Sequence, residues 1–128
     1  MWYKVCIRIV PRKTREDKRG DFLQGTLDIL ILKTVLPAPA HGHTIAHVIE
    51  RTSDEVLQVE HGSLYPALHR LEDQGLIASF WGTSENNRKA KYYRITPAGR
   101  KYLRQEHSRW HNLVEAIHRV LGPVPESE

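Results

Sequence analysis

The sequence predicts a mainly α-helical chain with one small β-hairpin, and three observations support this prediction. Apolar residues recur at helical spacing in separate segments. Two short runs rich in β-branched and aromatic residues flank a stretch of turn formers, Gly82–Asn87. Proline and glycine stand where the segments should end. A chain of 128 residues is long enough for one domain with one accessory element.

The first helix is expected to begin near Asp21, where the globular part starts, and to end before Pro37. Its inward face is formed by apolar residues at helical spacing, namely Leu23, Leu27, Leu30, Ile31 and Val35. His41 and Gly42 should then turn the chain into a short second helix over 44–51. A connector follows, with a brief extended piece predicted over Leu57–Val59.

The third helix is predicted from Ser63 to Gln74. Ser63 is a favourable N-cap, and Pro66 would fall in the first turn, where no intrahelical amide bond is lost. Gly75 supplies a left-handed stop. One face is apolar because four residues follow the i, i+3, i+4, i+7 pattern, namely Leu64, Ala67, Leu68 and Leu71.

The opposite face of this helix carries groups that can hydrogen-bond base edges or phosphate oxygens. These candidate DNA-reading residues are Ser63, Tyr65, Pro66, His69 and Arg70. We expect Arg70 to read bases, since a guanidinium can pair bidentately with guanine. The alternative is a plain core helix whose polar face is merely solvated.

Two strands are predicted after the third helix, Leu76–Trp81 and Ala90–Ile95. The end of their connection and the start of the second strand gather cations and amides, in Asn86, Asn87, Arg88, Lys89 and Lys91, and Glu85 at the tip opposes this charge slightly. Cations of this kind can neutralise DNA phosphates. Tyr92 and Tyr93 should point to opposite faces of the strand, so one of them should pack inward.

The last helix should begin at Thr96-Pro97, an N-cap followed by proline, and run to Leu121 before Gly122. It is expected to be a dimerisation helix, because without a partner chain its row of apolar side chains would be exposed to water. The predicted interface residues are Leu103, Trp110, Leu113, Val114, Ile117, Val120 and Leu121. Packing of this row against the core of the same chain is the alternative.

The expected organisation therefore has four parts. Residues 1–20 form a basic, mobile tail, residues 21–96 a winged helix-turn-helix domain, residues 97–122 the dimerisation helix and residues 123–128 an acidic tail. The single cysteine, Cys6, excludes an internal disulfide. Neither a signal peptide nor a membrane span is recognisable, so a cytoplasmic location is expected.

Enzyme and cofactor motifs are not found in the sequence. No glycine-rich phosphate loop and no nucleophile motif occurs, so an enzyme is not expected and no cofactor is predicted. Histidines lie at i, i+4 in two pairs, His43 with His47 and His107 with His111. Each pair lacks a third ligand in the pattern, so no metal site is predicted. Partial protonation of the histidines could still make DNA affinity rise as the pH falls.

Several motifs together resemble the PadR family of transcriptional regulators, over roughly residues 21–103. They are Gly25–Leu32, Pro39–Gly42, Gly62–Glu72, Gly82–Tyr93 and Thr96–Gly99. The resemblance implies a homodimeric winged-helix repressor whose third helix enters the major groove, whose hairpin touches the flanking backbone and whose last helix pairs the subunits. This chain departs from the family at His43, where a tyrosine is usual, and has a compact C-terminal part.

The sequence thus favours a sequence-specific DNA-binding regulator that acts as a homodimer on a palindromic operator. Double-stranded operator DNA and a second copy of the chain are the expected partners, and a small-molecule effector of unknown identity could release the DNA. Repression is the expected mode of action. A protein-interaction or membrane-signalling adaptor, with the basic hairpin on an acidic partner, and a histidine-based metal sensor are the alternatives.

Overall fold

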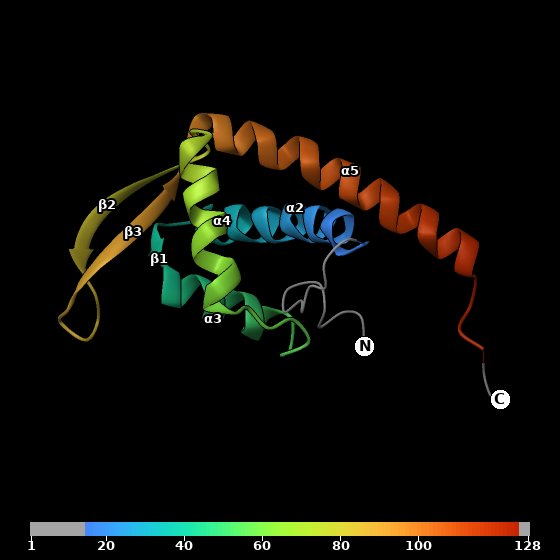
Figure 1. The fold of residues 1–128 in the computed structure, drawn as a ribbon, viewed down its shortest axis with the longest axis horizontal. Coiled ribbons are helices and arrows are strands. Elements are labelled where there is room, and N and C mark those ends of the chain that lie inside the picture. The colour runs from blue at the N-terminus through green and yellow to red at the C-terminus, as the bar shows by residue number, and fades with distance from the viewer. Residues whose placement is uncertain (1–14, 126–128) are drawn as a thin grey trace.

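The computed structural model describes residues 15–125, and the side chains of residues 25–125. Within this range the chain forms four helices and a three-stranded antiparallel sheet (Figure 1). The helices are α2 (Arg15–Val35), α3 (Gly42–Thr52), α4 (His61–Asp73) and α5 (Pro97–Leu121). The strands are β1 (Ala40–His41), β2 (Ile77–Thr83) and β3 (Lys89–Ile95). The predicted mainly helical class with a small hairpin is confirmed.

Helix α2 begins at Arg15, earlier than the predicted start at Asp21. Residues 15–20 are therefore helical and do not belong to a tail. The residues of this segment, with Arg, Glu and Lys among them, form helices readily and need no apolar stripe to do so. Residues 1–14 of the predicted basic tail lie outside the described residues, as do residues 126–128 of the acidic one.

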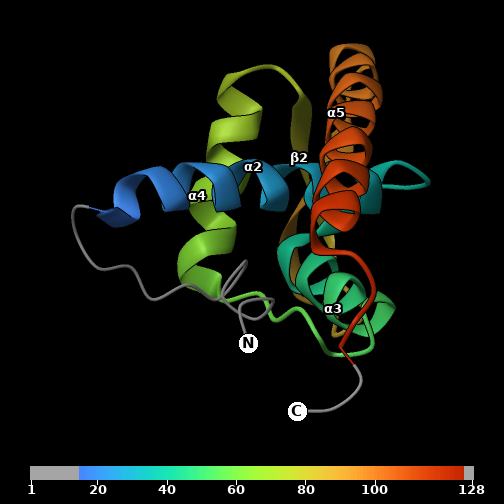
Figure 2. The ribbon, with the colours of Figure 1, turned by 90° about the vertical axis from the view of Figure 1, so that its right-hand side faces the viewer.

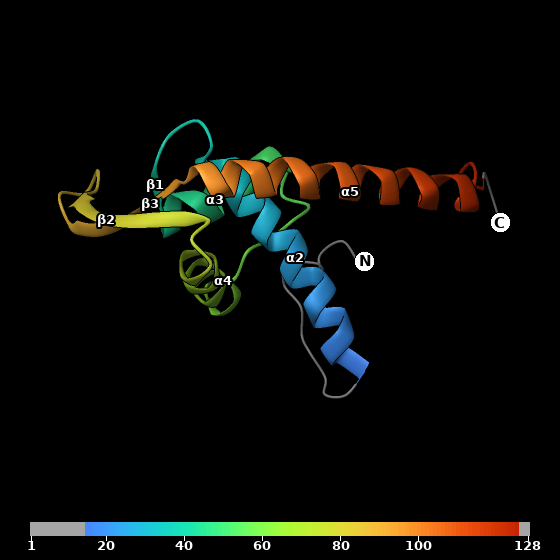
Figure 3. The same ribbon diagram turned by 90° about the horizontal axis from the view of Figure 1, so that it is seen from above.

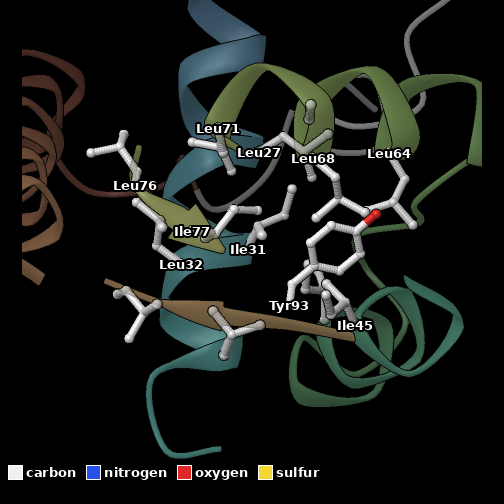
Figure 4. Packing of buried hydrophobic residues seen from close by; sticks show 14 of the residues in the cluster. Leu27, Ile31, Leu32, Ile45, Leu64, Leu68, Leu71, Leu76, Ile77 and Tyr93 are labelled. Carbon is white, nitrogen blue, oxygen red and sulfur yellow. The ribbon is translucent and has the colours of Figure 1, made fainter. Parts of the chain in front are cut away.

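The core lies where α2, α3, α4 and the sheet meet, and Figure 4 shows its side chains. Leu64 and Leu71 of α4 are fully buried, as are Ile31 of α2 and Ile45 of α3. Tyr93 of β3 points into this cluster and is 5% exposed, so the prediction that one of the two tyrosines packs inward is confirmed. Helix α2 crosses α4 and contacts α3 and α5 as well (Figures 1 and 2).

The N-terminus of α4 differs from the prediction. Glu60 occupies the N-cap position and Ser63 lies inside the first turn, so Ser63 is not the cap. The carbonyl of Glu60 accepts from the amides of Ser63 and Leu64 at 3.0 and 2.9 Å. Pro66 consequently falls beyond the first turn and leaves the Gly62 carbonyl without its usual helical donor.

The C-terminus of α4 follows the prediction closely. Gly75 has a φ of 75°, the left-handed conformation that favours glycine. The amide of Leu76 donates to the Leu71 carbonyl at 3.0 Å, and that of Gly75 donates to the Glu72 carbonyl at 2.9 Å. These two bonds form a Schellman motif, and the buried side chains of Leu71 and Leu76 accompany it.

The sheet has the order β1-β3-β2, and its first strand was not predicted. Ala40 and His41 pair with Tyr93 and Tyr92, where the sequence indicated only a turn. Two residues are too short to show an alternating pattern, so pairing with β3 alone defines this strand. The extended piece predicted over Leu57–Val59 does not form a strand in the described structure, and the amide of Val59 donates to Glu50 Oε2 at 2.8 Å.

Helix α5 runs from Pro97 to Leu121 as predicted. The Thr96 hydroxyl accepts from the Gly99 amide at 3.0 Å, which caps the helix as the sequence suggested. Figures 1 and 3 show α5 passing α2 and then extending beyond the rest of the chain, at the end opposite to the hairpin. No helix of residues 15–125 is long and apolar enough to span a membrane.

The junction between α5 and β2 requires a glycine. A Cβ at Gly99 would overlap the backbone carbonyl of Leu76 and would also crowd the side chain of Ile95. Gly99→Ala should therefore lower the free energy of unfolding by about 3 kcal/mol, because backbone cannot move aside easily. Gly62→Ala is the matched control, since the space around Gly62 is open and alanine favours a helix. Urea unfolding that shows equal stabilities for the two variants would contradict this packing.

Candidate nucleic-acid interface

The exposed face of α4 presents most of the predicted reading residues together. His61, Tyr65, Pro66 and His69 are exposed, and Ser63 is half-buried. Because Leu64, Ala67 and Leu68 hold the other side of the helix in the core, this polar face must point outward. His61 lies one turn before Tyr65 on the same face and was not among the predicted reading residues.

Tyr65 is held in place by two contacts. Its ring stacks on His61 with 5.6 Å between ring centroids, and it also lies against Gly42 at the start of α3. A Cβ at Gly42 would come within 2.8 Å of the tyrosine hydroxyl, so the ring would have to shift to make room for a side chain at this position. With 46% of its surface exposed, Tyr65 is oriented by the fold and still accessible to a ligand.

Arg70 does not belong to the exposed reading surface. Its Nη2 donates to Asp28 Oδ1 of α2 at 2.7 Å, forming an ion pair in which the carboxylate side chain is 10% exposed. Burial raises the pKa of Asp28, and the hydrogen bond and positive charge of Arg70 oppose that rise. In this structure the Arg70 guanidinium faces the neighbouring helix, and base reading by Arg70 stays a prediction.

The wing is the hairpin formed by β2, β3 and the turn Ser84–Arg88. The turn is closed by the Ser84 amide, which donates to the Arg88 carbonyl at 2.7 Å. Asn87 adopts a φ of 60°, a left-handed conformation that asparagine tolerates. Four of the predicted wing residues are exposed at or next to this turn, namely Asn86, Asn87, Arg88 and Lys89.

Lys91 serves mainly to hold the wing against α4. Its Nζ lies 3.8 Å from Glu72 Oε1, and the Ser79 hydroxyl donates to Oε2 of the same carboxylate at 2.5 Å. Glu72 thus joins α4 to both strands of the wing. Sequence reasoning grouped Lys91 with the free cations because the facing acid lies on another element.

Trp81 of β2 was also missed by the sequence analysis. It is 62% exposed, and Lys89 Nζ lies 5.1 Å from its ring centroid. The strand register places Thr83 opposite Lys89, so Trp81 lies diagonally across from the lysine. Only knowledge of this register could have brought these two residues together in advance.

A polar groove opens between α3, α4 and the wing, and we call it the α3–wing groove. Its volume is about 370 Å³. It is lined by residues 41–44 at the start of α3, by Tyr65, and by the wing residues Ser84, Glu85, Asn86, Lys89 and Lys91. The groove connects the exposed face of α4 with the cationic side of the wing, so the two predicted DNA-contacting surfaces are continuous.

The predicted interface residues of α5 separate into two groups. Leu103 is 7% exposed and belongs to the core of its own chain, so it is not available to a partner. Trp110 and Val114 are half-buried, and Trp110 lines a groove shared with α2. The others are exposed, from 39% for Leu113 and 47% for Ile117 to 73% for Leu121 and 85% for Val120.

The histidines do not assemble into a metal centre in the part of the chain that the structure describes. No group of three or more His, Cys, Asp or Glu side chains there is arranged to hold a metal ion. His43 and His47 instead stack with 5.9 Å between ring centroids, and His41 and His43 stack at 6.4 Å.

Comparisons with known proteins agree with this architecture. The model of the PadR-like transcriptional regulator family matches residues 31–105. A transcriptional regulator of Mycobacterium tuberculosis is 33% identical over 102 residues, which cover 80% of this chain and 89% of the relative. A transcriptional regulator structure from Clostridium thermocellum has a TM-score of 0.72 at 32% identity, covering 80% of this chain and 99% of that one. A PadR family regulator from Eggerthella lenta has a TM-score of 0.64 at 32% identity, covering 84% and 93%.

The ion pair between α2 and α4 can be tested by a double-mutant cycle. Arg70→Met should lower the free energy of unfolding by about 3 kcal/mol at pH 7, because it leaves the carboxylate of Asp28 buried without a partner. Asp28→Asn combined with Arg70→Met should recover part of this loss. Burial raises the pKa of Asp28, so the deficit of the single variant should shrink as the pH falls and the carboxyl group takes up its proton. A deficit independent of pH would contradict this assignment.

Proposed function

Because the chain belongs to the PadR-like family of transcriptional regulators, we propose that it binds a palindromic operator as a homodimer and represses transcription. Helix α4 is the reading element and lies in the major groove in this proposal. The wing contacts the backbone beside it. The observation that supports these roles best is the continuity of the exposed α4 face with the α3–wing groove and the cations of the turn.

The charge distribution supports different roles for α4 and the wing. Arg88 and Lys89 are exposed at the wing, and no acid occurs between Arg88 and Arg104 in the sequence. Such cations contact phosphates and add affinity for any sequence. Tyr65 and His69 on α4 carry hydrogen-bonding groups at the surface that would face base edges. Ser63 and Pro66 complete this surface.

The exposed end of α5 supports the homodimer. Leu113, Ile117, Val120 and Leu121 leave apolar surface in water, at a spacing that forms one stripe along the helix. A groove of about 330 Å³ runs beside this stripe between α5 and α2, with Ile29 and Trp110 in its lining. We assign a second copy of α5 to this surface, because a symmetric partner offers the same apolar stripe in return.

Repression follows from this arrangement if the dimer occupies its operator and excludes the transcription machinery. A small-molecule effector would release the DNA if it bound more tightly to a form of the dimer in which the separation of the two α4 helices does not match that of the operator half-sites. The primary test is selection of bound sequences from random duplex DNA. Recovered sites should be inverted repeats with half-sites separated by about one helical turn or a multiple of it. Recovery of unrelated sequences would instead favour an adaptor with a basic surface.

The wing and α4 should respond differently to substitution. Arg88→Ala should weaken binding to the selected operator and to mixed-sequence DNA alike, and should reduce the slope of log affinity against log salt by about one. Arg104→Ala on α5 is the matched control, since it removes an exposed cation away from the wing. Tyr65→Ala should cost about 1–3 kcal/mol on the operator and little on mixed-sequence DNA.

These affinities can be measured by fluorescence anisotropy over a range of salt concentrations. Equal losses on both kinds of DNA for Tyr65→Ala would remove the reading role from α4. An unchanged salt slope for Arg88→Ala would remove the phosphate-contacting role from the wing.

The proposed dimer should depend on the exposed stripe of α5. Ile117→Glu would place a charge in a buried interface, so the chain should become monomeric at micromolar concentration. Ser108→Glu, on the opposite side of the same helix, should leave the dimer intact. Light scattering gives the mass of both variants and of the parent chain. A parent chain that is monomeric, or an Ile117→Glu variant that stays dimeric, would contradict the assignment.

A further inference from the structure

The α3–wing groove contains a titratable side chain among fixed cations. Lys89 and Lys91 line one side of it, His43 lines the other, and Glu85 is the acid in the lining. Lys91 also lies 3.8 Å from Glu72, whereas Lys89 forms no ion pair with an acid of the residues that the structure describes. The hydroxyl of Tyr65 adds a neutral donor. A groove lined in this way suits a single negative charge that can also accept hydrogen bonds.

His43 is the central ring of a row of three imidazoles that runs from His41 to His47. What surrounds each ring decides which of them can reach a ligand in the groove.

The three rings differ in their surroundings. His41 Nδ1 accepts from the Thr44 amide at 3.4 Å as the N-cap of α3, and its other nitrogen lies 3.2 Å from the Thr44 hydroxyl. Both ring nitrogens of His41 are thus occupied by contacts within the chain. The edge of the His41 ring also contacts Tyr92 of β3. His47 lies outside the groove lining, whereas His43 is exposed and lies within it.

We propose that the α3–wing groove binds one backbone phosphate of the DNA and that His43 contacts this phosphate in its protonated form. This inference rests on the proposed DNA-binding function and adds a site and a pH dependence to it. Lys89 and the Tyr65 hydroxyl supply the remaining donors, and Glu85 opposes the phosphate. Binding of DNA then takes up a proton at His43, so affinity increases as the pH falls.

The test compares affinities for a fluorescent mixed-sequence duplex at about pH 6 and about pH 8, at constant ionic strength, since imidazole ordinarily titrates near pH 6.5. The parent chain should bind more tightly at the lower pH, and the part due to His43 should be about sixfold if phosphate binding raises the pKa of an ordinary imidazole by one unit. His43→Asn should lose that part and bind about as well as the parent chain at the higher pH.

Two further variants make the outcome specific. His43→Lys carries a permanent charge, so it should bind tightly at both pH values and lose the pH-dependent part. His107→Asn, which removes an exposed histidine of α5, should keep the full pH dependence. His61 and His69 on α4 can contribute a pH dependence of their own, which the His43→Asn variant retains. The difference in pH dependence between the parent chain and His43→Asn therefore reports on His43 alone.

The results separate the inference from the proposed function. A His43→Asn variant whose pH dependence equals that of the parent chain would overturn the phosphate site, while DNA binding itself would stand. Failure of the parent chain and every variant to bind duplex DNA at either pH would overturn both. Thermal unfolding of each variant shows whether its fold is intact, and His43→Lys gives a gain that loss of structure cannot produce.

Discussion

The position of α4 rests on its apolar packing and on an ion pair with a neighbouring helix. Asp28 and Arg70 join α2 to α4 at 2.7 Å, on the helix whose Leu64 and Leu71 are buried in the core. Breaking such a pair from one side is costly because the remaining charge stays without a partner. The pair therefore adds a specific contact to the apolar packing that turns the polar face of α4 outward. Glu72 fixes the position of the wing relative to the same helix.

The charged residues of α4 and the wing thus have two different tasks. Arg70 and Lys91 are bound to acids of the same chain and give the surface its shape. Arg88 and Lys89 form no ion pair with an acid within residues 25–125, so their charge is available to a polyanion. A count of basic residues cannot make this distinction. It follows from the positions of Asp28 and Glu72, which lie on elements that the cations contact only after folding.

Local patterns were sufficient to predict most elements of the fold. The helical stripes of α2, α4 and α5, the Thr96 cap and the Gly75 stop depend on residues close in sequence, and the structure confirms them. The misses have non-local causes. Strand β1 exists only through pairing with β3, and Leu103 is buried only because α5 starts against the core.

The candidate site shows the same pattern. The exposure of Tyr65 and His69 follows from helix periodicity, which the sequence displays. The role of Arg70 depends on a residue of α2 that lies far away along the chain. The α3–wing groove is formed by three separate elements, so no single sequence motif predicts it.

The tight contact at Gly99 affects where the far end of α5 lies relative to the hairpin. Helix α5 contains 25 residues, so it is a rod of about 37 Å that is attached to the hairpin at its first turn. A tilt of a few degrees at such a joint displaces the far end by several ångströms. Each residue added to or removed from the rod would turn its tip by about 100°. In the proposed dimer, the length of α5 would therefore help to set the separation of the two α4 helices.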